Sequence, residues 1–467
     1  MRYSPSRFEC EAGRWTLSVL DLIGNTPLVR VEGLDTGLCE LYLKLENQNP
    51  GGSIKDRIGL SMIQAAERDG KVGASQRHLV EATAGNTGLG LALVANLKGY
   101  RLTLVIPDKM SQEKVFHLKA LGAQVLMTRS DVERGHPDYY QDVAERIARD
   151  EGAFFVNQFA NPANPLAHET TTGPEIARQM GGKLDAMVCG VGSGGTLTGL
   201  SRFFAREIPA CDMVLADPAG SVLAGYVATG QVGKAGSWAV EGIGEDFVPP
   251  IADLSRVRRV YTISDRESLM TARQLLRKVG ILAGSSSGTL LAAALQYCRE
   301  QGTAKRVCTL VCDSGNKYLS KMYDDFWMVD QGFLERASTG DLRDVVARRH
   351  SERAVVTVQP SDTLLVAYGR MKLYDVSQLP VIEAGRIVGI VDESDLLAAA
   401  AEDESRFRSP VREVMSTRLR SVATATPVHE LLPMFDAGLV PIVMDGDEFV
   451  GLVTRIDLLN YLRRRLR

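Results

Sequence analysis

One lysine of this chain stands where a run of turn-forming residues gives way to an amphipathic helical pattern. The run is NQNPGGS at 47–53, and Lys55 follows it where the helical pattern begins. A lysine at the start of a helix lies near the positive end of the helix dipole, which disfavours its ammonium form. Lys55 is therefore a candidate reactive amine, although a single lysine is more often a solvated surface charge.

Three glycine-rich segments precede other expected helices. They are AGNTG at 84–88, GSGGT at 192–196 and GSSSG at 284–288. The second follows an apolar run, and its amides and two hydroxyls could surround a phosphate. No lysine follows it in the pattern of a P-loop, which favours a small phosphorylated cofactor over a nucleoside triphosphate. The first segment presents an amide and hydroxyl set suited to a carboxylate. Each segment alone could equally be a helix cap with a glycine turn.

Positioning these segments requires an alternating pattern of strands and helices. Short apolar runs alternate with amphipathic stretches from about residue 20 to residue 314. Strands are expected at 102–106, 124–127 and 186–189, and a helix begins near Thr196. This pattern predicts a doubly wound α/β fold, in which strand–loop–helix junctions bind phosphorylated ligands.

Beyond about residue 328 the chain carries two copies of one small α/β unit. Segments 380–382 and 389–391 with Asp395 match segments 441–443 and 451–453 with Asp457, a period of roughly sixty residues. The expected limits are 1–330 for the first part, 331–340 for a linker, and 341–401 and 408–467 for the two copies.

Composition narrows the class of protein. The 467 residues are 45% hydrophobic and 24% charged, which is typical of soluble proteins with two or three domains. A formal net charge of -3 provides no basic excess for nucleic acid or anionic lipid. No apolar stretch suggests export or a membrane span. Seven cysteines without a pairing rhythm favour reduced thiols in the cytoplasm, and no metal site is expected.

Together the motifs resemble the fold-type II enzymes that use pyridoxal 5'-phosphate (PLP), and among them the cystathionine β-synthase family. The resemblance covers essentially the whole chain. Besides the Lys55 segment and the three glycine-rich segments, it rests on EGIGEDF at 241–247 and DSGNKYLSKMYDDFWM at 313–328. The C-terminal repeat resembles a tandem pair of CBS domains. The resemblance implies two doubly wound α/β subdomains followed by this pair.

The same resemblance implies roles for the cofactor-site residues. Lys55 would form the Schiff base with PLP, and Asn86 would bond the ring hydroxyl of PLP. The phosphate would be held by Gly192, Ser193, Gly194, Gly195 and Thr196. Ser286 would face the pyridine nitrogen. A neutral hydroxyl there makes the ring a weaker electron sink, which favours β-elimination over transamination.

Substrate-binding roles are implied as well. The substrate carboxylate would be received by Thr83, Gly85, Thr87 and Gln158, and the pocket mouth would be formed by Gly242, Gly244 and Glu245. Glu245 could pair with the ammonium of a second substrate, or it could be an exposed loop acid. Ala84 and Phe159 stand where the family often has serine and tyrosine. The N-terminal segment offers Cys10 but no histidine before His78, so no haem is expected.

The reaction implied is the condensation of L-serine with L-homocysteine to cystathionine and water. Release of hydrogen sulfide from cysteine is an expected side activity. A cysteine synthase that uses O-acetylserine or O-phosphoserine with sulfide is the nearest alternative. An inactive nucleotide sensor is an alternative of a different class. The expected assembly is a homodimer or homotetramer, without nucleic acid or membrane partners.

The repeat carries a second candidate site. In CBS domains an acidic side chain at the start of the last helix can hold the ribose of an adenosyl ligand. The candidates are Thr454 and Asp457 in the second copy and Asp395 in the first. Asp392 occupies the usual threonine position of the first copy, which favours the second copy and S-adenosylmethionine. Each aspartate could instead cap its helix in a module that serves dimerisation.

Overall fold

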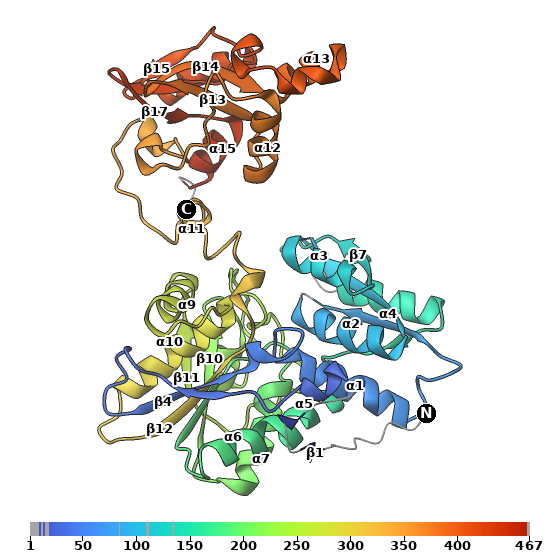
Figure 1. Ribbon diagram of the computed structural model, residues 1–467. Helices are drawn as coiled ribbons and strands as arrows, with labels where there is room; N and C mark the ends of the chain where they lie inside the picture. The colour runs from blue at the N-terminus through green and yellow to red at the C-terminus, as the bar shows by residue number, and fades with distance from the viewer. Residues whose placement is uncertain are drawn as a thin grey trace. The chain divides into compact units, whose positions relative to one another are not determined.

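A computed structural model describes residues 9–10, 13–14, 18–83, 85–108, 112–132 and 135–464. The chain forms two compact units, Met1–Tyr323 and Asp324–Arg467 (Figure 1). Within the described ranges, no helix has both the length and the apolar character needed to cross a membrane. The limits expected for the catalytic part, the linker and the two repeats stay predictions.

The first unit contains a mostly parallel sheet of six strands. Its order is β11, β10, β9, β12, β4 and β3, which span Val257–Ile263, Asp212–Pro218, Ala186–Cys189, Arg306–Val311, Glu40–Leu45 and Leu28–Arg30. β3 runs antiparallel to β4, and the other neighbours pair in parallel. Every residue of β9 is buried, as expected for a strand that is covered on both faces. The predicted strand at 186–189 is confirmed.

Helices surround this sheet (Figure 1). They are α5 (Ala163–Ala167), a π-helix (His168–Thr172), α6 (Gly173–Gln179), α7 (Gly195–Glu207), α8 (Leu223–Thr229), α9 (Asp265–Val279) and α10 (Ser285–Arg299). α10 is buried along most of its length, because small and apolar residues follow its serines and it packs against α9 and β12. A short strand pair, β1 (Glu9–Cys10) and β2 (Gly13–Arg14), lies near the N-terminus of the chain.

A second, smaller sheet holds the AGNTG segment. Its parallel strands are β7, β6, β5 and β8, which span Gln124–Thr128, Arg101–Pro107, His78–Ala82 and Phe154–Phe155. Its helices are α1 (Lys55–Arg68), α2 (Asn86–Lys98), α3 (Gln112–Ala120) and α4 (Tyr140–Asp150). The predicted strands at 102–106 and 124–127 are confirmed. The two sheets with their helices form the two α/β subdomains that the resemblance implied.

Helices α1 and α2 approach each other through their backbones. A Cβ atom on Gly90 would lie 2.5 Å from the Lys55 carbonyl oxygen, and one on Gly59 would lie 2.7 Å from the Gly90 carbonyl carbon. Side chains larger than hydrogen would therefore force the helices apart. This contact places the N-terminus of α1, with Lys55, beside the helix that begins at Asn86.

The second unit repeats one arrangement twice. In the first copy, β13 (Gln378–Glu383) pairs with β14 (Arg386–Asp392) and α13 (Glu393–Glu402) follows. In the second copy, β16 (Ile442–Asp445) pairs with β17 (Glu448–Leu452) and α15 (Arg455–Arg464) follows. The second unit also contains α11 (Asp325–Asp330), α12 (Leu364–Tyr374), β15 (Ser421–Ala423), α14 (Leu432–Asp436) and several short 3-10 helices. Each copy has its own apolar core, so the predicted repeat is confirmed.

Candidate functional site

Lys55 is the first residue of α1 and is tied to the segment that follows β12. The amide of Ile54 donates to the Cys312 carbonyl at 2.8 Å, and the amide of Ser314 donates to the Gly52 carbonyl at 3.1 Å. The Lys55 residue as a whole is half-buried. Desolvation of its amine lowers the pKa of Lys55, while Cys312, Glu245 and Asp313 act to raise it. A lowered pKa makes the neutral, nucleophilic amine more accessible near neutral pH.

The GSGGT segment forms a tight loop between β9 and α7. Gly194 has a φ of +90°, and α7 begins at the next residue. A Cβ atom on Gly192 would lie 2.5 Å from the Gly242 carbonyl oxygen, and one on Gly195 would overlap the Asn164 side chain. The loop is therefore built for close backbone approach. Free amides at a helix N-terminus, with two hydroxyls beside them, suit a phosphate.

Two buried side chains support the hydroxyls of this loop. Asn164 Nδ2 donates to Ser193 Oγ at 2.9 Å, which leaves the hydroxyl hydrogen of Ser193 available for an anion. His168 Nε2 lies 3.2 Å from Thr196 Oγ1, and His168 Nδ1 lies 3.0 Å from Thr172 Oγ1. Burial holds the pKa of His168 well below its usual value, so the imidazole is neutral.

Sequence reasoning missed both Asn164 and His168. They lie on α5 and the π-helix, and no metal-ligand or nucleophile pattern surrounds them in the sequence. A π-helical turn is often found at functional sites, but no sequence pattern predicts where it occurs. Only the contacts with the loop identify the two residues.

The AGNTG segment brings together most of the residues predicted to bind a carboxylate. The Gly85 amide donates to Thr83 Oγ1 at 3.2 Å, and Thr87 Oγ1 donates to Gln158 Oε1 at 2.6 Å. Ala84 lies outside the described residues. Beneath this loop, burial raises the pKa of Glu81 to about 8, so its carboxyl group is mostly protonated at neutral pH.

The GSSSG and EGIGEDF segments meet at the start of α10. Ser285 Oγ accepts from the Glu241 amide at 3.0 Å, and Ser287 Oγ accepts from the Cys312 amide at 2.9 Å. Ser286 lies between them and is buried. The two neighbouring serines thus fix the backbone, whereas Ser286 makes a side-chain hydrogen bond with Cys312.

The segment that contains Gly242, Gly244 and Glu245 lies beside the GSGGT loop. The Gly244 amide donates to the Val191 carbonyl at 2.8 Å. The Glu245 backbone is held by Ser221 Oγ, which accepts from its amide at 3.1 Å. The carboxylate of Glu245 acts electrostatically to raise the pKa of Lys55, against the larger effect of burial. Phe159 packs against Phe247 with ring centroids 5.7 Å apart, so this residue contacts the same segment without a hydroxyl.

Comparison with known proteins identifies the group to which this arrangement belongs. The model of the pyridoxal-phosphate dependent enzymes matches residues 19–313, and the CBS domain model matches residues 343–402 and 411–464. A cystathionine beta-synthase of Dictyostelium discoideum is 35% identical over 96% of this chain and 92% of its own length. The chain belongs to the cystathionine β-synthase family. The cofactor of this family is PLP. Membership of the family supports the prediction that the chain is a PLP-dependent lyase that carries out β-replacement.

Solved structures resemble the chain over about two thirds of its length. An O-acetylserine dependent cystathionine beta-synthase from Helicobacter pylori is 36% identical, with a TM-score of 0.61, and the match covers 66% of this chain and 98% of that one. A hydrogen sulfide-producing enzyme from Fusobacterium nucleatum is 35% identical, with a TM-score of 0.60, over 65% of this chain and 100% of that one.

The residues of the first unit fit PLP. The glycines at 192, 194 and 195 leave no room for a side chain, the supported hydroxyls of Ser193 and Thr196 belong to the same loop, and Lys55 provides an amine of lowered pKa. Asn164 Oδ1 is buried and has no hydrogen-bond partner within the described chain. In the parts of the chain that the structure describes, no group of three or more His, Cys, Asp or Glu residues is placed to hold a metal ion.

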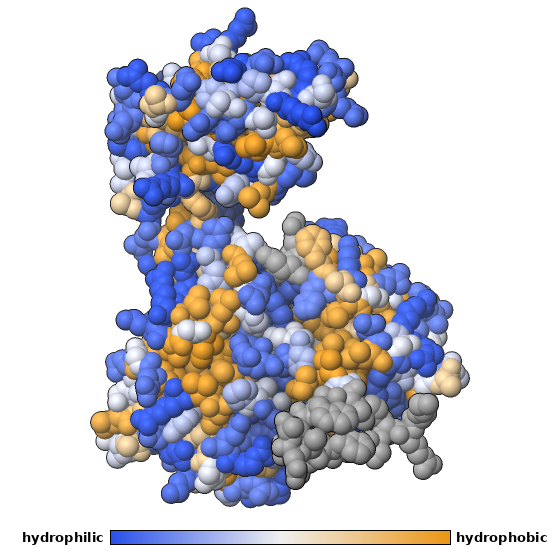
Figure 2. All heavy atoms as spheres, in the orientation of Figure 1, coloured by the Kyte–Doolittle hydropathy of each residue, from blue (hydrophilic) through white to orange (hydrophobic). Residues whose placement is uncertain are grey.

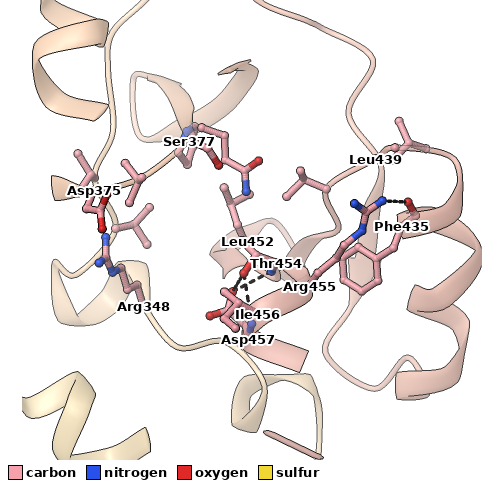
Figure 3. A pocket seen from close by; sticks show the side chains of 17 residues that line it. Arg348, Asp375, Ser377, Phe435, Leu439, Leu452, Thr454, Arg455, Ile456 and Asp457 are labelled. Carbon is pink, nitrogen blue, oxygen red and sulfur yellow. Dashed lines mark hydrogen bonds between the residues drawn. The ribbon is translucent and has the colours of Figure 1, made fainter. Parts of the chain in front are cut away.

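The second unit contains a cavity of about 540 Å³ that is lined by both copies of the repeat. Figure 3 shows Arg348 and Asp375 on one side of it and Phe435 and Arg455 on the other. Thr454 and Asp457 line this cavity. Asp457 Oδ2 accepts from the Thr454 amide at 2.8 Å and from Thr454 Oγ1 at 2.6 Å.

Asp395 is placed differently from Asp457. It forms a reciprocal capping box with Asp392 at the start of α13, with hydrogen bonds of 3.0 and 2.9 Å between side chains and amides. Asp395 is absent from the residues that line the described cavity. Asp395 thus serves as a helix cap in the first copy. Asp457 forms a similar cap in the second copy and also lines the cavity. Burial raises the pKa of Asp457.

Proposed function

We propose that this protein is a cystathionine β-synthase that joins L-serine to L-homocysteine and releases water. The observation that carries the proposal is the position of Lys55 at the start of α1, tied to the segment after β12, in a chain that matches relatives of that name over 96% of its length. The helix that bears Thr87 packs against α1, and the turn that bears Ser286 is bonded to Cys312 in the segment that holds this lysine.

Bound PLP supplies an electron sink that weakens the bond between Cα and its hydrogen in an attached amino acid. The residues of the chain perform the remaining tasks. Thr83, Gly85, Thr87 and Gln158 bind the carboxylate of the amino acid. The released Lys55 amine takes the α-proton and gives it to the departing hydroxyl, which leaves as water. It then takes the proton of the homocysteine thiol as the sulfur bonds to Cβ, and passes that proton to Cα.

Three further side chains influence the outcome of this reaction. Asn86 bonds the ring hydroxyl of PLP, and the neutral hydroxyl of Ser286 faces its ring nitrogen, which keeps the electron sink weak and favours β-chemistry. Glu245 lies where its carboxylate could pair with the ammonium of homocysteine. Sulfide carries no such ammonium, so this pairing would favour homocysteine.

The two candidate donors and the two candidate thiols define a four-way test. Purified full-length protein is assayed with serine or O-acetylserine, each against homocysteine or sulfide, and products are identified by mass spectrometry. We expect serine with homocysteine to give the highest kcat/KM. Preference for O-acetylserine with sulfide would instead establish the cysteine synthase alternative. Preference for O-acetylserine with homocysteine would match the name of the Helicobacter pylori relative. Hydrogen sulfide release from cysteine is followed separately.

We further propose that the cavity of the second unit binds an adenosyl ligand, with S-adenosylmethionine favoured. Asp457 would accept hydrogen bonds from the ribose hydroxyls, which are charge-assisted and stronger than neutral ones. The apolar walls that Phe435, Leu439 and Leu452 provide would cover the adenine. Calorimetric titration of the full chain with S-adenosylmethionine, ATP and AMP tests this assignment.

We also propose a cytoplasmic homo-oligomer without haem. The six cysteines whose side chains the structure describes are free thiols, which suits a reducing compartment. Figure 2 shows apolar side chains gathered in patches on the surface of the first unit. Exposed apolar residues of that unit include Leu97, Phe116 and Met127, and such surface favours association. Light scattering of the purified protein gives its mass, and an absorption spectrum detects haem.

A further inference from the structure

Two charged residues of the DSGNKYLSKMYDDFWM segment hold the side-chain amide of Asn86. Lys317 Nζ donates to Asn86 Oδ1 at 2.9 Å. Asn86 Nδ2 donates to Asp313 Oδ2 at 2.8 Å. The residues are 231 and 227 positions apart in sequence, so the contacts join the start of α2 to the segment after β12.

The charges decide which way the amide of Asn86 points. An ammonium group can only donate hydrogen bonds, and a carboxylate can only accept them. Lys317 therefore fixes the amide oxygen on its side, and Asp313 fixes the amide nitrogen on the other. Asn86 Nδ2 donates one hydrogen to Asp313 and keeps a second. Through that second hydrogen, Asn86 can act as a donor toward a further ligand.

Lys317 and Asp313 are held in the same buried cluster. Lys317 is 6% exposed and also donates to the carbonyls of Gly51 and Gly52, at 3.1 and 3.2 Å. Asp313 is fully buried and accepts from Tyr318 Oη at 2.7 Å. Burial lowers the pKa of Lys317, while Asp313 and Asp56 act in the opposite direction. Buried charges are costly, and removal of one member of a buried pair leaves its partner uncompensated, so the two charges depend on each other.

We propose that Lys317 is a positioning residue for the cofactor. Acting through Asn86, it presents an N–H donor to the ring oxygen of bound PLP and stabilises that oxygen as an anion. This inference rests on the role proposed for Asn86. The ring oxygen and the adjacent imine nitrogen of lysine-bound PLP share one proton. A donor at the oxygen keeps this proton on the nitrogen, which is the form that absorbs visible light.

The test compares the visible band with the near-ultraviolet band of the oxygen-protonated form, at one pH, in full-length holoenzyme. Lys317→Met removes the ammonium, and we expect the visible to near-ultraviolet ratio to fall about tenfold, which corresponds to about 1.4 kcal/mol. Lys317→Gln keeps a neutral donor to Asn86, so its ratio should fall measurably but less. Lys321→Met is the matched control, because Lys321 donates to Glu241 at 2.8 Å and should leave the ratio unchanged.

A second arm tests whether Lys317 acts through Asn86. In an Asn86→Ala background, Lys317→Met should produce no further change in the ratio, whereas independent roles would give additive changes. A folded Lys317→Met protein with the wild-type ratio overturns the proposal, as does an equal change in Lys321→Met. If Lys317→Met does not fold, an unchanged ratio in Lys317→Gln overturns it. Failure of the wild-type protein to bind PLP would instead defeat the proposed function, before any variant is compared.

Discussion

Replacement of Arg57 by methionine should destabilise the first unit strongly, because Arg57 holds two buried carboxylates. Its guanidinium donates to both oxygens of Glu46 at 2.7 Å and to both oxygens of Glu175 at 2.8 Å. The side chains of Arg57, Glu46 and Glu175 are 2%, 0% and 7% exposed. Lys44 remains as a partner for Glu175, at 2.7 Å. The network joins the first turn of α1, and thus Lys55, to β4 and α6.

The magnitude follows from the loss of one member of a buried network. Removing the partner of a buried charge costs about 3 to 5 kcal/mol. Arg206 provides the matched control: it pairs with Glu169 and Glu207 but is 56% exposed, so Arg206→Met should leave the unfolding midpoint close to that of the wild type. Urea unfolding followed by the visible circular dichroism of bound PLP reports the stability of this unit. Equal midpoints for the two variants would refute the reasoning.

The pH dependence of the same variant has a definite sign. Burial alone would raise the pKa of Glu175, but hydrogen bonds and charge from Arg57 and Lys44 outweigh it and lower the pKa to about 2. A depressed native pKa adds stability above the unfolded value, and that stability is lost as the pH falls from about 4.3 toward 2. The stability difference between wild type and Arg57→Met should therefore narrow in acid. A constant or widening difference would contradict this assignment.

Three further variants test other parts of the account. Ser286→Asp should lower β-replacement activity and change the cofactor spectrum, because a carboxylate would stabilise the protonated form of the ring nitrogen; unchanged turnover and spectra would remove this claim. Glu245→Ala should raise the KM for homocysteine and spare sulfide release from cysteine, whereas equal losses would count against a selective role. Asp457→Ala should abolish the heat and thermal stabilisation produced by S-adenosylmethionine; if the wild type shows neither with any adenosyl ligand, the second unit has a structural role alone.

The elements that position the site could be predicted from sequence because their signals are local. The strand at 186–189 and the helix from Gly195 are separated by a glycine loop, and each boundary has its own turn or capping signal. The tandem repeat was equally visible, because its two copies share apolar and glycine positions. Family motifs then pointed to Lys55, Asn86 and Ser286 as the candidate cofactor residues.

The side chains that support these residues could not be predicted, because their partners are distant in sequence. Lys317 meets Asn86 across 231 residues, and His168 meets Thr196 across 28. Neither lysine nor histidine has a spacing that distinguishes it from ordinary polar residues. The sequence favoured Asp457 over Asp395, because Asp392 stands at the threonine position of the first copy. It could not show the cavity itself, because both aspartates cap a helix and only the packing around Asp457 leaves an open space.

The most direct test of the central claim is to find the lysine that carries the cofactor. Reduction of the holoenzyme with borohydride makes the bond between PLP and lysine permanent, and peptide mass spectrometry then locates the added mass. We predict that the label lies on Lys55 and is absent from Lys44 and Lys317, the two other buried lysines with lowered pKa values in this unit. A label on either of these lysines, or none, would contradict the account.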